Sequence, residues 1–185
     1  MKIKFILFLV FYSYSVNAQV SFKVKQLAKP LDTISYAESS HIGIGGKSSK
    51  IYDYFRKVSK IAKNDELYYF AKNGSSALKL YSSQELFKRN DKRFLEIYQY
   101  YHDNPLIMKY QNGCIIEKES ITVYLKNEVH SAKDIISLRD SLLQEKRRDL
   151  IKNQLTSIYV EGYRNLSQEN LEFCLKEIER IDSGK

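Results

Sequence analysis

From residue 48 onward, apolar side chains recur at the spacing of an α-helix. Ile51, Phe55, Val58 and Ala62 follow one another at intervals of three or four residues, which places them on one helical face. Similar segments follow, separated by a few residues rich in Ser, Asn, Asp or Gly, which begin and end helices. Connections this short require neighbouring helices to lie antiparallel. The sequence therefore predicts a single helical domain over residues 48–185.

Cap and stop signals place the expected helices along this domain. After the first helix, "ELYYFAK" is expected to end at Gly74, and "ALKLYSSQELFKR" to follow a Ser cap. "FLEIYQYY" ends before Pro105, and the stretch "LIMKYQNGCII" has no helical period, so we interpret it as an ordered loop or extended crossover. The remaining helices are expected at about Glu117–Val129, at about Asp134–Ile158 and after Ser167.

Residues 19–47 are expected to form an irregular, partly extended segment. Val20, Phe22 and Val24 alternate with polar residues, which is typical of a short extended stretch. Pro30 interrupts any helix, "TISYAESS" does not have the pattern of a buried strand, and "ESSHIGIGGKSS" is rich in turn residues. The predicted fold class is therefore all-α with an irregular N-terminal segment.

One part of the helical region resembles a known class. The segment "DELYYFAKNGSSALKLYSSQEL" resembles a HEAT-type helical hairpin, although Ser82 stands where Ala is usual and Lys79 where Arg is usual. Residues 43–125 also resemble uncharacterised secreted proteins of Bacteroidota, through a Gly-rich turn, a Tyr-x-x-Phe helix, the hairpin and an Asn-Gly-Cys-Ile stretch. The positions that match the hairpin's second helix are Ala77, Leu78, Leu80, Tyr81 and Leu86. The resemblance implies HEAT-like antiparallel helical hairpins, as a short α-solenoid or bundle, at an extracytoplasmic location. It implies no activity.

The first eighteen residues have the order of a secretory signal peptide. Lys2 and Lys4 precede an apolar run that is too short to span a bilayer, and Val16 and Ala18 provide small residues before a cleavage site. The alternative is a buried N-terminal element of the domain. The sequence predicts a signal peptide over residues 1–18 and export to the periplasm or beyond. It predicts no transmembrane segment after cleavage.

Motifs for cofactor and metal chemistry are incomplete. Gly46-Lys47-Ser48 ends like a nucleotide-binding P-loop, but His41 occupies the position of the required first Gly. His41, His102 and His130 are scattered without a metal-ligand spacing. We therefore predict no cofactor and no metal, and no residue is singled out as catalytic. The alternative is a nucleophilic pair of Cys114 with His102 or His130, although a buried structural Cys is far commoner.

Charge and cysteine usage narrow the choice of partner. The formal net charge is +8, but both signs are interleaved, so no nucleic-acid partner is expected. Cys114 and Cys174 could form a disulfide in an oxidising compartment, or each could be a buried small apolar residue.

The chain contains fifteen Tyr and no Trp. Adjacent tyrosines point to different sides of a helix, so both members of a pair cannot be in the core. We predict an interaction surface that includes Tyr68, Tyr69, Tyr100 and Tyr101. The alternative is that these are ordinary boundary residues with hydrated hydroxyls.

Two functional hypotheses follow from these features. The first is a non-enzymatic secreted or periplasmic helical domain that binds a protein or a cell-envelope component. The second is a small extracytoplasmic hydrolase whose site is assembled only in the tertiary structure. A concave pocket of converging Glu, Tyr and His would favour the hydrolase, and a flatter surface without perturbed pKa values would favour the binding domain.

Overall fold

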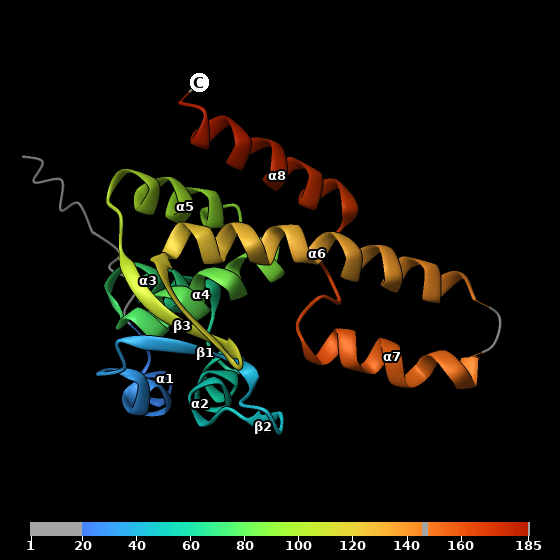
Figure 1. The fold of residues 1–185 in the computed structure, drawn as a ribbon, viewed down its shortest axis with the longest axis horizontal. Coiled ribbons are helices and arrows are strands. Elements are labelled where there is room, and N and C mark those ends of the chain that lie inside the picture. The colour runs from blue at the N-terminus through green and yellow to red at the C-terminus, as the bar shows by residue number, and fades with distance from the viewer. Residues whose placement is uncertain (1–19, 146–147, 185) are drawn as a thin grey trace, which may run out of the picture.

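The computed structural model describes residues 20–145 and 148–184, so the predicted signal peptide lies outside the described residues. Figure 1 shows the order and arrangement of the elements. They are α1 (Phe22–Ala28), the 3-10 helix η1 (Lys29–Leu31), β1 (Tyr36–Ile42), β2 (Lys47–Ser48), α2 (Lys50–Ser59), α3 (Asn64–Asn73), α4 (Ser76–Lys88), α5 (Arg93–Asp103), β3 (Ile107–Gly113), β4 (Ile115–Ser120), α6 (Ile121–Gln144), α7 (Arg148–Val160) and α8 (Gln168–Asp182).

The prediction of an all-α fold is wrong, because four strands form a mixed sheet in the order β2-β1-β3-β4. β1 and β3 run parallel, and β2 and β4 are antiparallel to their neighbours at the two edges. The expected helix pair α3 and α4 is present across the turn at Gly74. It packs within a mixed α/β fold, however, and does not begin a stack of HEAT-like hairpins.

The strand β1 was missed because its burial does not alternate. Ala37 is fully buried and its neighbour Glu38 is only 8% exposed. Burial of Glu38 is compatible with a strand because its carboxylate accepts a hydrogen bond of 2.5 Å from the Ser49 hydroxyl. A buried acidic residue beside a buried apolar one has neither the alternating pattern nor the continuous apolar pattern of a strand.

The N-terminal segment is ordered rather than irregular. Val20, Val24, Ala28 and Leu31 are buried and follow helical spacing through α1 and η1. The alternation of Val20, Phe22 and Val24 suggested an extended stretch, but Phe22 is 76% exposed and takes no part in the core. The two-residue period of a strand and the 3.6-residue period of a helix both fit these few residues, and the helical period is correct.

The stretch "LIMKYQNGCII" is the hairpin of β3 and β4 rather than a loop. Asn112 pairs with Ile115 across a two-residue turn, in which Gly113 has a φ of 56°. Glycine adopts this left-handed conformation without a steric cost. The helix predicted from Glu117 consequently begins only at Ile121, and it continues as far as Gln144. The single helix expected over residues 134–158 is divided between α6 and α7.

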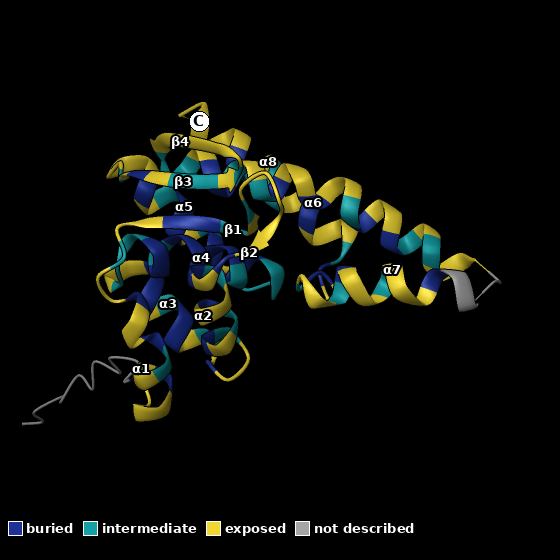
Figure 2. Ribbon diagram, turned by 60° about the horizontal axis from the view of Figure 1, so that its bottom comes forward, coloured by how far each residue is buried: buried dark blue, intermediate teal, exposed yellow. Residues whose placement is uncertain are grey.

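The core lies where α2, α4 and α6 meet the sheet. α2 and α4 contact β1, and α6 packs on α4 and β4, while α8 covers α5 and α6. Figure 2 shows the buried residues concentrated in this region, whereas the C-terminal part of α6 extends away from it together with α7. Among the described residues, no helix combines the length and the apolar character that a membrane span requires.

The hydroxyl of Tyr81 joins α4 to the open side of β1. In the described part of the chain, β2 pairs with β1 only at His41 and Ile42, and no strand meets the backbone of Glu38 on that side. The Tyr81 hydroxyl accepts a hydrogen bond from the Glu38 N–H at 2.7 Å and donates one to the Glu38 carbonyl at 2.6 Å. One phenol therefore satisfies both backbone groups in the place of a neighbouring strand.

We predict that Tyr81→Phe lowers the free energy of unfolding by about 1–3 kcal/mol, because it leaves a buried N–H and a buried carbonyl without partners. Denaturant melts of the purified variant measure the change. Tyr54→Phe on α2 is the matched control, since Tyr54 is 37% exposed. Equal, small effects from the two variants would mean that the Tyr81 hydroxyl does not hold β1 against α4.

Candidate functional site

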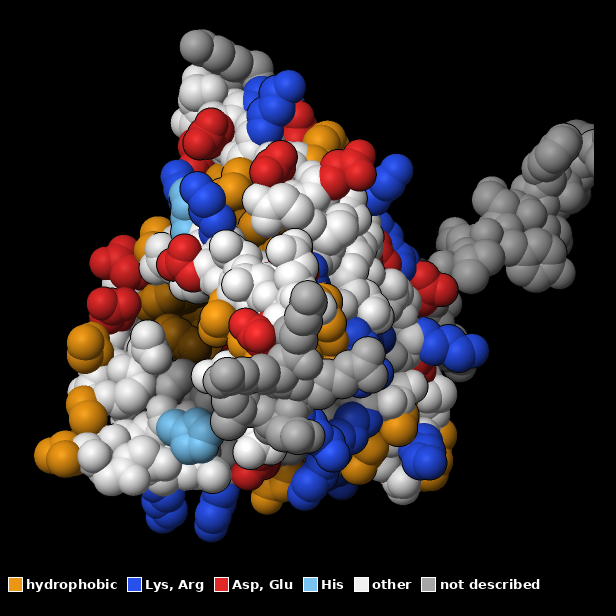
Figure 3. All heavy atoms as spheres, turned by 90° about the vertical axis from the view of Figure 1, so that its right-hand side faces the viewer, with side chains coloured by type: hydrophobic (Ala, Val, Ile, Leu, Met, Phe, Trp, Pro, Cys, Tyr) orange, Lys and Arg blue, Asp and Glu red, His pale blue; other side chains and the backbone are white. Residues whose placement is uncertain are grey.

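A polar cleft lies between α4, α6, the sheet and the residues that follow α7. Its volume is about 220 Å³. Figure 3 shows the face at the α6–α7 end, where charges of both signs surround a recess of side chains of the hydrophobic class, which includes Tyr. The side chains that give the cleft its chemistry are Tyr52, Gln84, Lys88, Tyr110, Glu128 and Tyr163.

The carboxylate of Glu128 is the centre of the cleft. The Lys88 ammonium lies 2.9 Å from Oε1, and the Gln84 side-chain amide donates to Oε2 at 3.1 Å. The Tyr163 hydroxyl donates a further hydrogen bond to Oε1. The side chains of Lys88 and Glu128 are only 12% and 19% exposed. This is therefore a largely buried ion pair with hydrogen bonds that complete it.

The ion pair fixes the protonation states in the cleft. Burial disfavours the charge of Lys88, but the Glu128 carboxylate outweighs burial and raises the pKa of Lys88 well above its ordinary value. Burial also disfavours the charge of Glu128, yet the Lys88 charge and the Tyr163 hydrogen bond lower the pKa of Glu128. Burial raises the pKa of Tyr163. All three groups consequently keep one protonation state around neutral pH.

Arg139 holds Tyr163 in place through hydrogen bonds to the connection between α7 and α8. Arg139 is 7% exposed, and its Nη1 donates to the carbonyl of Tyr163 at 2.7 Å and to that of Leu166 at 2.6 Å.

Gly162 has a φ of 97°, and a Cβ there would lie 3.1 Å from Cδ of Lys88. Both the backbone conformation and the close approach to Lys88 therefore favour glycine.

Tyr52 and Tyr110 add two phenol groups to the cleft. The Tyr110 ring packs on Tyr124 with centroids 5.1 Å apart, and the Tyr52 ring lies 5.7 Å from that of Tyr81. Burial raises the pKa of Tyr52, and it raises the pKa of Tyr110 to about 12. Neither hydroxyl makes a hydrogen bond to another residue within the described part of the chain. Both are free to bind a ligand.

The predicted tyrosine surface is only partly assembled. Tyr68 and Tyr100 lie on either side of the Lys72 ammonium, which is 5.6 Å and 5.1 Å from their ring centroids. Tyr69 is 40% exposed beside this pair, with its ring against Phe70. Tyr101 is buried, and its hydroxyl donates to the Ala71 carbonyl at 2.6 Å. Tyr101 is therefore a core residue.

The two cysteines are free thiols in this structure. Cys114 is exposed in the turn between β3 and β4, and Cys174 is half-buried on α8. Burial raises the pKa of Cys174 to about 11, which keeps this thiol protonated and unreactive. The structure does not bring them together as a disulfide.

The Gly-rich turn and the histidines lie outside the cleft. Gly43 to Gly46 form the hairpin turn between β1 and β2, whereas a P-loop connects a strand directly to a helix. His41 is exposed beside Ser40, and His102 pairs with its neighbour Asp103. In residues 20–145 and 148–184, no three His, Cys, Asp or Glu side chains gather as a metal site would require.

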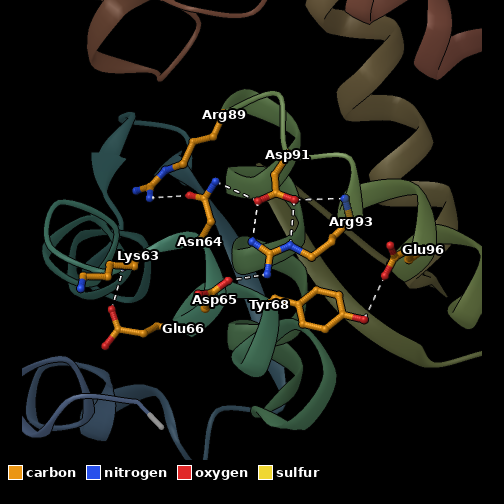
Figure 4. A network of polar contacts seen from close by, with 9 residues as sticks. All are labelled: Lys63, Asn64, Asp65, Glu66, Tyr68, Arg89, Asp91, Arg93 and Glu96. Carbon is orange, nitrogen blue, oxygen red and sulfur yellow. Dashed lines mark hydrogen bonds and ion pairs between the residues drawn. The ribbon is translucent and has the colours of Figure 1, made fainter. Parts of the chain in front are cut away.

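A second polar cluster joins the start of α3 to the turn between α4 and α5 (Figure 4). Asp91 accepts hydrogen bonds from Asn64 and from Arg93, which also reaches Asp65, and the side chain of Asn64 accepts one from Arg89. The hydrogen bonds from Arg93 lower the pKa of Asp91. Because these groups satisfy one another between backbone elements, we interpret this cluster as structural.

The sequence patterns did not single out Lys88, Glu128 and Tyr163. Lys88 lies in the charged run "LFKRNDKR", which has the composition of a solvated helix face. A usable signal was the helical spacing of Tyr81, Gln84 and Lys88. These three residues lie on one face of α4, so their polar groups indicate a shared polar partner. The element that provides this partner can be identified only in the tertiary structure.

Comparisons of the chain with protein-family models, with curated proteins and with solved structures gave no match. A functional assignment therefore has to rest on the geometry and the chemistry of the cleft.

We predict that Glu128→Gln lowers the free energy of unfolding by about 2–4 kcal/mol at neutral pH, because Lys88 loses the charge that compensates its burial. The folded-state pKa of Glu128 is lowered, so this contribution is complete above the ordinary Glu pKa of about 4.3. It is lost as the pH falls through the folded-state value.

Denaturant melts of wild type and variant between pH 7 and pH 3 measure this difference. Glu179→Gln, at an exposed position of α8, is the control and should have little effect at any pH. A difference between wild type and Glu128→Gln that does not change with pH would contradict the assigned ion pair.

Proposed function

We propose that this protein is a non-catalytic binding domain that holds part of a cell-envelope component or partner in the cleft around Glu128. The observation that carries the proposal is the pair of free hydroxyls of Tyr52 and Tyr110 beside a completed ion pair. A ligand can hydrogen-bond to these hydroxyls without disturbing the charges that stabilise the fold. The cleft is thus suited to recognition.

The protonation states in the cleft favour binding over catalysis. The convergence of Glu128 with several tyrosines in a concave site meets part of what the hydrolase hypothesis requires, but no His is among the described residues that line the cleft. A general acid or base, however, works best with a pKa close to the operating pH. The pKa of Glu128 is lowered, and those of Lys88 and Tyr163 are raised, so each moves away from that range.

The proposed location is outside the cytoplasm. This part of the proposal rests on the charged start, the apolar run and the small-residue site of residues 1–18. An envelope ligand and an exported protein would share a compartment, so the two parts of the proposal are consistent with each other.

The binding proposal is tested by co-sedimentation of the purified protein with envelope fragments from the producing cells. We expect Tyr52→Phe/Tyr110→Phe to bind about tenfold more weakly than wild type, since two hydrogen bonds are removed and both rings remain. Tyr54→Phe, outside the cleft, should bind normally. Undiminished binding of the double variant would place the site elsewhere, and release of new chemical groups from the envelope material would indicate an enzyme.

Export is tested separately by intact-mass analysis of the protein recovered from the envelope or the medium. We expect a chain that begins at Gln19 or at its pyroglutamate form, because cleavage should follow Ala18. Recovery of a chain that retains residues 1–18, or recovery only from the cytoplasm, would refute the proposed location.

A further inference from the structure

The free groups of the cleft are hydroxyls and an amide oxygen. The phenol hydroxyls of Tyr52 and Tyr110 can each donate and accept a hydrogen bond, and so can the hydroxyl of Ser131 at the rim. Gln84 donates to Glu128 through its nitrogen, and its oxygen makes no hydrogen bond to the described residues. Groups of this kind complement a ligand that carries several hydroxyls, which also donate and accept.

The charges of the cleft disfavour an anionic group beside Lys88, although Arg56, Lys60 and Arg89 line the groove that adjoins the cleft. Lys88 is compensated by Glu128 at 2.9 Å, so its charge is not available to a phosphate or carboxylate. Glu161 is exposed at the mouth of the cleft and adds a negative charge there. A negatively charged group would be repelled by this carboxylate and would also have to compete with Glu128 for Lys88.

The dimensions indicate a ligand longer than the cleft. At about 220 Å³ the cleft is smaller than the roughly 300–1,000 Å³ of pockets that enclose a whole small molecule. It adjoins a groove of about 460 Å³ between α2, α4 and the end of α7, and Tyr52 and Glu161 line both. One unit of a linear ligand can therefore occupy the cleft while the following units lie along the groove.

Aromatic surfaces line both parts of this path. Tyr52 and Tyr110 line the cleft, and Tyr159 lines the groove. The Tyr159 ring is held by the Arg164 guanidinium at 4.6 Å from its centroid. Aromatic faces provide apolar contact for the C–H surfaces of a sugar ring, while nearby hydroxyls bind its polar edge.

We propose that the cleft and the adjoining groove bind a neutral oligosaccharide, with one terminal sugar beside Tyr52, Tyr110 and the Lys88–Glu128 pair. This inference rests on the proposed function, for which it names the class of ligand. It assigns the Tyr52 and Tyr110 hydroxyls to hydrogen bonds with the terminal sugar. It assigns the groove to the sugars that follow.

The test is titration calorimetry of the purified protein with maltohexaose, cellohexaose and hexa-N-acetylchitohexaose. We expect at least one of them to bind, and the matching monosaccharide to bind more weakly because it leaves the groove empty. Tyr52→Phe/Tyr110→Phe should weaken the binding by about tenfold, since only the two hydroxyls are lost. Thermal unfolding of each variant establishes that it is folded, and Tyr54→Phe is the matched control.

Different outcomes separate this inference from the proposed function. If none of the three oligosaccharides binds, the ligand class is wrong, and envelope binding that still depends on Tyr52 and Tyr110 would leave the proposed function intact. Competition of envelope binding by a polyanion such as heparin would likewise overturn the ligand class alone. Oligosaccharide binding that the double variant retains in full would overturn the site.

Discussion

The carboxylate of Glu128 connects three parts of the molecule that are distant in sequence. It accepts hydrogen bonds from Gln84 and Lys88 of α4 and from Tyr163 beyond α7, and it is itself carried by α6. A carboxylate so little exposed is stable only with these partners, because unpaired charge in a protein interior costs several kcal/mol. The need to pair this carboxylate therefore favours the packing of α6 on α4 and the position of Tyr163 after α7.

This demand also explains the path of the chain after α7. Arg139 donates to the carbonyls of Tyr163 and Leu166, so the connection to α8 is held by a buried guanidinium rather than by apolar packing alone. The Tyr163 hydroxyl and the Lys88 ammonium can then both contact Oε1 of Glu128. The cleft therefore lies where the chain closes around one buried charge, and the partners of that charge form part of its wall.

The helices α2 to α5 and α8 were predictable, whereas α1, the bounds of α6 and α7, and the sheet were not. α2 and α3 have apolar faces of helical period, and the side chain of Ser49 does cap α2 by accepting from the Tyr52 N–H, although the N-cap of α3 is Lys63 rather than a Ser, Asn or Asp. β1 has no such signal, because it depends on a buried Glu38 and on a phenol from α4. The candidate site was missed for a related reason. Its members come from separate elements, and Lys88 and Glu128 each have the sequence context of a solvated face.

The parallel pairing of β1 with β3 has a consequence for the order of folding. The N–H of Gly113 donates to the hydroxyl of Ser39, 74 residues earlier in the chain, and α2 to α5 all lie between these two strands. Closing a loop of this length before its contents are ordered is entropically unfavourable. We therefore expect the intervening helices to form first and to bring the strands together. On the ribosome, β1 would emerge early and remain without its partner until β3 had been synthesised.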